Sequence, residues 1–109
     1  MQVIYGTGQY REGKQQYRGR IIMGEHRLFL KSPDGDIPAT YIPMEKIIRV
    51  RRTFSGLTID VHASAVKHYR VILQSGSAIL SALTKDLVQK RHLKKKLLFP
   101  EWFDETAGR

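Results

Sequence analysis

A period-two alternation of apolar and polar residues between Leu57 and Gln74 constrains the fold of this chain more than any other feature. Successive side chains of a β-strand point to opposite faces, so this alternation is typical of strands that bury one face. The pattern is interrupted only near Ser64-Ala65-Val66 and then resumes. It therefore predicts an antiparallel hairpin whose loop is formed by these three residues.

The pairing expected for this hairpin agrees with its charges. A loop at residues 64–66 places apolar residues of the two strands opposite one another on one face. On the other face it places an acidic residue opposite a basic one, which stabilises a strand pair. The expected pairs are Val61–Tyr69, Ile59–Val71, Asp60–Arg70 and His62–His68.

The rest of residues 2–74 also indicates strands and turns. Gly24-Glu25 separates two apolar segments and suits a two-residue turn, because glycine adopts positive φ at the first central position. Residues 32–36 have the Pro, Asp and Gly content of a loop. Within residues 47–54, one face is expected to carry Ile48, Val50 and Phe54, and the other Arg49 and Arg51.

One long helix is expected after the hairpin. Ser77 suits its N-cap, and an apolar stripe at helical spacing follows. Lys94-Lys95-Lys96 is expected at its end, because basic residues in a last turn face the negative end of the helix dipole. Pro100 then prevents continuation. The stripe consists of Ile79, Leu80, Leu83 and Leu87.

These elements predict a mainly β fold with one C-terminal α-helix. The chain has 109 residues, of which 41% are apolar and 27% are charged, as in a single globular domain. We expect about six or seven strands before the helix. The domain is expected to span residues 1–98, followed by a C-terminal tail at residues 99–109.

Two segments resemble a known superfamily. The segment from Tyr17 to Lys31 resembles the start of the GRAM branch of the pleckstrin-homology superfold, where a glycine and an apolar strand precede a turn and an Arg-Leu-apolar strand. The segment from Ile42 to Val50 is similar to the "IPL..I..V" element of that branch. With the hairpin and the helix, the resemblance covers roughly residues 15–93, and it extends to pleckstrin-like domains of bacteria and of archaeal chemotaxis adaptors.

The resemblance implies a bent antiparallel barrel or sandwich that is capped by the C-terminal helix. The binding role is expected on other grounds, namely the absence of catalytic groups and the basic surface. The chain departs from the family in its only tryptophan, because pleckstrin domains carry one within the helix, whereas Trp102 lies beyond it. The tail from Glu101 to Arg109 has no counterpart in the family.

Lys14, Arg18 and Arg20 are similar to the phosphoinositide-binding signature of pleckstrin-homology domains, a lysine followed by Lys/Arg-x-Arg. Alternate strand residues place both arginines on one face, where guanidinium groups bind phosphate bidentately. Lys14 is expected in a loop, whereas the family places this lysine on the first strand. The competing interpretation is a solvated strand face.

Two further basic groups are candidate anion sites. Arg49 and Arg51 share a face, although charges there also protect a sheet edge from aggregation. A denser group at the end of the expected helix suits anionic lipid or a nucleic-acid backbone; the alternative is a solvated helix end. It consists of Lys90, Arg91, Lys94, Lys95 and Lys96.

The segment from Leu97 to Phe103 contains five large apolar residues near the end of the chain. Two interpretations remain open. Phe99, Trp102 and Phe103 fold back over an open end of the barrel in place of the missing helix tryptophan. Alternatively, the segment docks a partner or a second copy, because contiguous exposed apolar patches mark interaction sites. The contact residues would then be Leu98, Phe99, Trp102 and Phe103.

The sequence predicts no catalytic residue, no metal site and no cofactor. The chain has no cysteine, which excludes disulfides, thiolate zinc sites and cysteine nucleophiles. Only His62 and His68 are expected to meet, and two imidazoles without further ligands make a poor zinc site. Gly6-Thr7-Gly8 is too short for a phosphate-binding loop.

We therefore expect a non-enzymatic adaptor that acts through protein contacts, as in signalling. The alternative is peripheral binding to anionic lipid, which the net charge of +9 also favours. Nucleic acid ranks third, because Phe29, Phe54 and Tyr69 are expected in the core and not available for base stacking. Without an apolar run of ~18 residues or a signal-peptide pattern, a cytoplasmic location is expected, including the inner membrane face.

Overall fold

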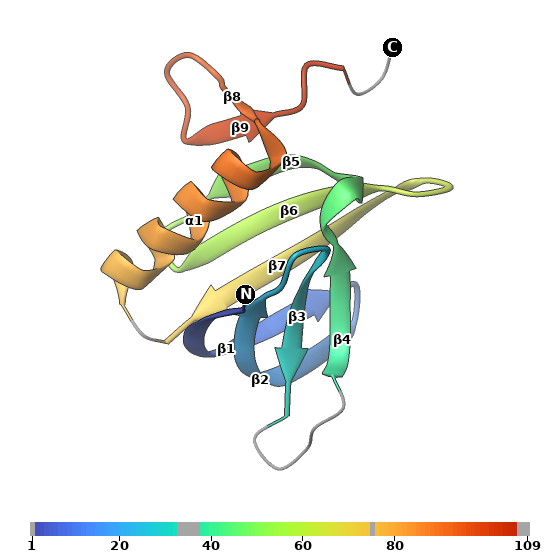
Figure 1. Ribbon diagram of the computed structural model, residues 1–109, viewed down its shortest axis with the longest axis vertical. Helices are drawn as coiled ribbons and strands as arrows, with labels where there is room; N and C mark the ends of the chain where they lie inside the picture. Colours follow the sequence, from blue (N-terminus) through green and yellow to red (C-terminus); the bar gives the residue numbers. More distant parts are fainter. Residues whose placement is uncertain (1, 33–37, 75, 107–109) are drawn as a thin grey trace.

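The computed structural model describes residues 2–32, 38–74 and 76–106, and it is mainly β with one helix (Figure 1). This confirms the predicted fold class. The described residues form nine strands in one antiparallel sheet of order β4-β3-β2-β1-β7-β6-β5-β9-β8, more strands than expected. The strands are β1 (Val3–Glu12), β2 (Gln15–Met23), β3 (Arg27–Lys31), β4 (Pro38–Pro43), β5 (Ile47–Arg52), β6 (Gly56–His62), β7 (Val66–Leu73), β8 (Lys94–Lys95) and β9 (Glu101–Phe103).

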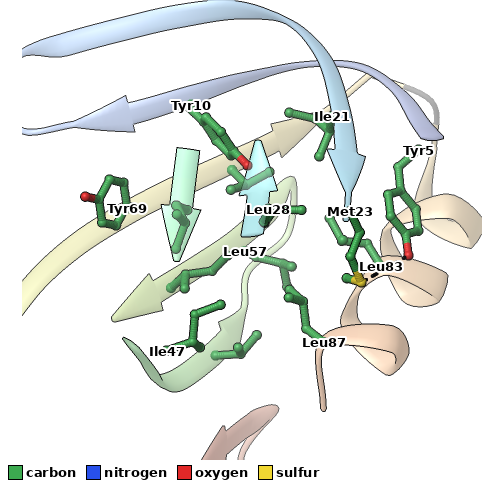
Figure 2. Packing of buried hydrophobic residues seen from close by; sticks show 14 of the residues in the cluster. Tyr5, Tyr10, Ile21, Met23, Leu28, Ile47, Leu57, Tyr69, Leu83 and Leu87 are labelled. Carbon is green, nitrogen blue, oxygen red and sulfur yellow. Dashed lines mark hydrogen bonds between the residues drawn. The ribbon is translucent and has the colours of Figure 1, made fainter. Parts of the chain in front are cut away.

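The helix α1 (Ser77–Arg91) lies beside β5 and β6, and a short 3-10 helix, η1 (Met44–Lys46), joins β4 to β5 (Figure 1). Strands from both halves of the sheet contribute to one core with α1, and Figure 2 shows part of it. Because β1 pairs with both β2 and β7, it joins the two halves. The largest fully buried side chains are Tyr10, Ile21, Leu28, Leu30, Ile42, Ile47, Leu57, Ile59, Leu83 and Leu87.

Glycines allow close approach of neighbouring strands. Gly8 and Gly19 are paired across β1 and β2, and Gly56 begins β6. A methyl group on Gly19 would overlap the carbonyl oxygen of Lys31, and one on Gly56 would overlap that of Val71. The backbone packing at these positions therefore requires glycine.

The prediction for the hairpin of β6 and β7 is correct for the buried face but wrong for the register. The loop consists of residues 63–65, one position earlier than expected. Each residue of β6 therefore pairs with a β7 residue two positions before the expected one. Since strand side chains alternate with a period of two, this shift leaves the apolar face in the core. The observed pairs are Leu57–Val71, Ile59–Tyr69, Thr58–Arg70, Asp60–His68 and His62–Val66.

Two local predictions in the first half of the chain are wrong. The turn between β2 and β3 has Glu25 and His26 at its centre, and Gly24 accordingly donates its N–H to the Arg27 carbonyl at 2.9 Å. Phe54 is fully exposed, because β5 ends at Arg52 and an irregularity between Ile47 and Arg49 disrupts the strict alternation.

Both ends of the helix differ from expectation. The N-cap is Gly76, without a side-chain cap bond, and Ser77 is the first helical residue. Leu80, Leu83 and Leu87 are buried as expected. Ile79 is partly exposed, and Thr84 is the fourth buried residue of the helix.

The helix ends at Arg91, and Lys94-Lys95-Lys96 lies outside it. His92 adopts φ 53°, and the N–H groups of His92 and Leu93 bond to the carbonyls of Gln89 and Val88 at 3.3 and 3.0 Å. This is the Schellman pattern of helix termination, and the buried Leu93 supplies its apolar contact. Lys94 and Lys95 form β8.

The C-terminal segment folds back onto the sheet. β9 pairs antiparallel with β5, which places Trp102 beside Val50 and packs it against the core. β5 is therefore not a sheet edge, contrary to the expectation for Arg49 and Arg51. Phe99 remains exposed, so the fold-back interpretation holds for Trp102 and not for Phe99.

Tyr10 is 1% exposed, and its hydroxyl has no hydrogen-bond partner among the described residues; Figure 2 shows it inside the core. Burial raises the pKa of Tyr10 well above its ordinary value. We expect Tyr10→Phe to increase the free energy of unfolding by about 1 kcal/mol, because an unsatisfied buried hydroxyl is removed.

The pH dependence of Tyr10→Phe checks the same point. The Tyr10 hydroxyl has a higher pKa in the folded state than in the unfolded state. The stability of wild type is therefore fully present below pH ~10 and falls as the pH rises further, because the unfolded chain ionises first. Urea denaturation from pH 7 to 11 should therefore find a smaller alkaline loss in the variant. A variant less stable than wild type at pH 7 would contradict the unpaired state of this hydroxyl.

Candidate functional site

Exposed apolar side chains lie in two neighbouring turns at the β5–β9 side of the sheet. We call this group, Phe54, Leu97, Leu98 and Phe99, the apolar tip. Phe54 lies in the turn between β5 and β6, and the other three lie between β8 and β9. Phe54 is fully exposed, and Leu97 and Leu98 are 86% and 93% exposed. All four side chains are exposed in the described part of the chain.

The backbone holds the two loops of the apolar tip together. Arg52, at the end of β5, donates its N–H to the carbonyl of Pro100 at 2.8 Å. The Phe54 turn is closed by Thr53, whose N–H donates to the Gly56 carbonyl at 2.8 Å. Phe54 and Phe99 therefore belong to neighbouring, well-anchored turns.

Leu98 has φ 70°, in the left-handed region. A non-glycine residue there costs roughly 1–2 kcal/mol. The turn between β8 and β9 therefore holds an apolar side chain outward at some cost in stability. Strained residues of this kind cluster at functional sites.

Two cations lie beside the apolar tip. The ammonium group of Lys96 lies 5.3 Å from the ring centroid of Phe99. Arg52 bonds to Pro100 and, with Lys85 and Trp102, lines a depression of about 330 Å³. We call Arg52 and Lys96 the tip cations.

Lys14, Arg18 and Arg20 do not converge. Lys14 lies in the turn between β1 and β2, whereas Arg18 and Arg20 are exposed on one face of β2. Lys14 and Arg20 are six positions apart along the extended chain, which corresponds to about 20 Å. Only the two arginines form a local pair.

The basic group at the end of α1 and just after it is partly neutralised by the acidic tail. Arg91 pairs with Asp104 at 3.3 Å and donates to the Ile47 carbonyl at 3.1 Å. Lys94 pairs with Glu105 at 2.6 Å. Lys90 and Lys95 are exposed and form no ion pair with any described residue. The acidic partners come from the tail, which the sequence pattern did not connect with these lysines.

The Asp104 carboxylate fastens this segment. The Thr106 hydroxyl donates to it at 2.7 Å and the Thr106 N–H at 2.9 Å. These hydrogen bonds, and then Arg91, lower the pKa of Asp104. The tail therefore keeps its negative charge beside Arg91.

Arg49 is engaged rather than free. It pairs with Glu101 at 3.2 Å and with Asp60 at 3.6 Å. Asp60 is 2% exposed and also meets His68 Nδ1 at 2.6 Å. Asp60 was expected on the solvated face, but it is buried and contacts its two cross-strand neighbours, Arg49 and His68.

A depression of about 570 Å³ lies beside this network. Two of the cationic residues that line this depression, Arg49 and Lys96, both contact the carboxylate of Glu101. Its lining residues are Ile48, Arg49, His62, Val66, Lys96, Glu101, Phe103 and Asp104.

His62 and His68 do not meet, because each pairs with a different residue. Among the described residues, no group of three or more His, Asp or Glu side chains is arranged to hold a metal ion.

Tyr5 donates its hydroxyl to Asp86, and burial together with this contact raises the pKa of Tyr5. These polar contacts join β1 to α1 and are structural.

No protein-family model matches the chain, and no curated protein matches its sequence. Within residues 2–32, 38–74 and 76–106, no helix is long and apolar enough to cross a membrane.

Proposed function

We propose that this chain is a non-enzymatic binding module that attaches peripherally to an anionic membrane surface by inserting its apolar tip. The observation that carries this proposal is the adjacency of two turns that expose Phe54, Leu97 and Leu98. Neither turn has a cover among the described residues. Attachment of this kind occurs at the inner face of a cellular membrane, where anionic lipids concentrate.

Burial of the apolar tip in the bilayer contributes hydrophobic free energy to membrane binding. Full burial of a Leu or Phe side chain is worth about 1.5–3 kcal/mol. Several such side chains on neighbouring turns enter the acyl boundary together, without unfolding any strand. The tight turns also limit the entropy lost on insertion, because their backbones are already ordered.

The tip cations supply the preference for anionic lipid. Each Lys or Arg near an anionic surface contributes about 1 kcal/mol. Lys96 beside Phe99, and Arg52 next to the Phe54 turn, lie at the depth of the headgroups once the apolar side chains are inserted. An apolar tip rimmed by cations suits a bilayer better than a flat protein surface, because its apolar residues project from turns.

The arrangement of strands supports a pleckstrin-like architecture for this module. Seven strands in the order β4-β3-β2-β1-β7-β6-β5 precede one helix, as the resemblance of the segments from Tyr17 to Lys31 and from Ile42 to Val50 implies. Two features fall outside that pattern, β8 and β9. The turn between them carries Leu97, Leu98 and Phe99 of the apolar tip.

Co-sedimentation with vesicles tests the attachment. Wild type should bind vesicles that contain phosphatidylcholine and phosphatidylserine. It should bind much more weakly to vesicles of phosphatidylcholine alone. Phe54→Ser should weaken binding to the mixed vesicles about tenfold, because one inserted side chain is worth at least ~1.4 kcal/mol.

Ile4→Ser is the matched control, since Ile4 is 59% exposed on β1, away from the apolar tip. It should bind like wild type. Equal weakening by both variants, or equal binding to neutral and anionic vesicles, would contradict the proposal. Absence of wild-type binding to either vesicle would favour the adaptor interpretation, in which the apolar tip docks a protein.

A further inference from the structure

A row of three arginines crosses the outer face of the sheet. Arg11 of β1 is opposite Arg70 of β7, Arg70 is opposite Thr58 of β6, and Thr58 is opposite Arg51 of β5. We call Arg11, Arg70, Arg51 and Thr58 the arginine row. The three arginines are exposed and come from segments far apart in the sequence.

The carboxylates next to the arginine row contact other cations. Glu101 lies opposite Arg51, but its carboxylate contacts Arg49 and Lys96 instead. Glu12, next to Arg11 in sequence, points to the other face and contacts Lys67 at 3.8 Å. None of the three arginines forms an ion pair within the described part of the chain.

Arg11 opposite Arg70 is unfavourable for the isolated protein. Like charges at directly opposite positions of an antiparallel pair destabilise the sheet. Positions on an exposed face admit many other polar residues at no cost. An anion that bridges the two guanidinium groups would convert this repulsion into attraction.

We propose that the arginine row binds a small anion that bears two or more phosphate groups. Neighbouring strands are about 4.8 Å apart, so Arg11 and Arg70 reach adjacent phosphate groups, and Arg51 lies about 10 Å from Arg70. Guanidinium groups form paired hydrogen bonds with phosphate oxygens. The Thr58 hydroxyl lies between Arg70 and Arg51 and donates a further bond.

This site is independent of the apolar tip. Its ligand is a soluble oligophosphate, and recognition needs the spacing of several phosphates, not total charge. A single orthophosphate spans one pair of arginines at most. The site therefore discriminates by ligand length.

Thermal denaturation with sodium tripolyphosphate tests the arginine row. A ligand that binds only the native state raises the midpoint temperature. Tripolyphosphate should stabilise wild type, whereas orthophosphate at the same ionic strength should have a much smaller effect. Arg70→Thr should bind tripolyphosphate at least tenfold more weakly by calorimetric titration. Without ligand, it should be at least as stable as wild type, because the like-charge pair is removed.

Lys46→Thr is the matched control, because it also removes one exposed positive charge, from η1, away from the row. It should keep the response of wild type. Equal losses in Arg70→Thr and Lys46→Thr would overturn the proposal and indicate attraction by net charge alone. Orthophosphate as effective as tripolyphosphate would overturn it as well. Arg11→Thr provides an independent second variant and should behave as Arg70→Thr does.

Discussion

Gly56→Ala is expected to lower the free energy of unfolding by about 3 kcal/mol or more, because the added methyl group has no room. A Cβ at this position would overlap the carbonyl oxygen of Val71 and lie 3.0 Å from its carbonyl carbon. Both atoms belong to the backbone of β7, which cannot rotate away as a side chain would. Relief requires separating β6 from β7, and that breaks the hairpin which supplies Leu57 and Val71 to the core.

Urea denaturation followed by circular dichroism measures this loss. Gly19→Ala should behave similarly, because its methyl group would overlap the carbonyl of Lys31. Gly24→Ala is the matched control, since its added methyl would meet only the Arg27 carbonyl oxygen and the Phe29 ring, both at 3.5 Å. It should change stability by less than about 1 kcal/mol. Equal effects of Gly56→Ala and Gly24→Ala would contradict the close approach of β6 and β7.

The fold class was predictable because it depends on periodicity. Alternation between Leu57 and Gln74 identified the buried face of the hairpin even though the register was wrong, since a shift of two positions keeps each side chain on its face. The helical stripe was equally clear for Leu80, Leu83 and Leu87. These signals are local and repeat several times.

Features that depend on tertiary pairing were not predictable. Nothing local indicates that the segment from Glu101 to Phe103 joins β5, which turns an expected edge strand into an interior one. The same pairing brings Glu101 to Arg49 and Asp104 to Arg91. Phe54 was expected in the core because strict alternation places it on the face of Val50, whereas β5 ends at Arg52 and its alternation is interrupted between Ile47 and Arg49.

The candidate surfaces divide in the same way. The apolar run at Leu97 to Phe103 was visible in the sequence, whereas its meeting with the Phe54 turn required the fold. Arg70 was expected opposite Asp60, and its place opposite Arg11 could not be predicted, because it depends on the pairing of β1 with β7. Lys94 and Lys96, conspicuous in the sequence, are paired with the tail.

Trp102→Ala and Leu98→Gly are expected to separate stability from membrane attachment. Trp102 packs against the core, so its truncation should lower the free energy of unfolding by about 2–3 kcal/mol. Leu98→Gly removes an exposed side chain and relieves a φ of 70°, so stability should be unchanged or higher. Binding to phosphatidylserine-containing vesicles should nevertheless fall about tenfold in Leu98→Gly.

Denaturation and vesicle co-sedimentation on the same preparations measure both properties. Trp102→Ala should still bind vesicles at temperatures where it remains folded, because Trp102 faces the core and lies outside the apolar tip. If Leu98→Gly bound vesicles as wild type does, Leu98 would have no part in insertion. If Trp102→Ala lost binding without any loss of stability, Trp102 itself would be the docking residue. The pair thus separates the two roles proposed for the C-terminal segment, since one residue fastens it to the sheet and the other projects from it.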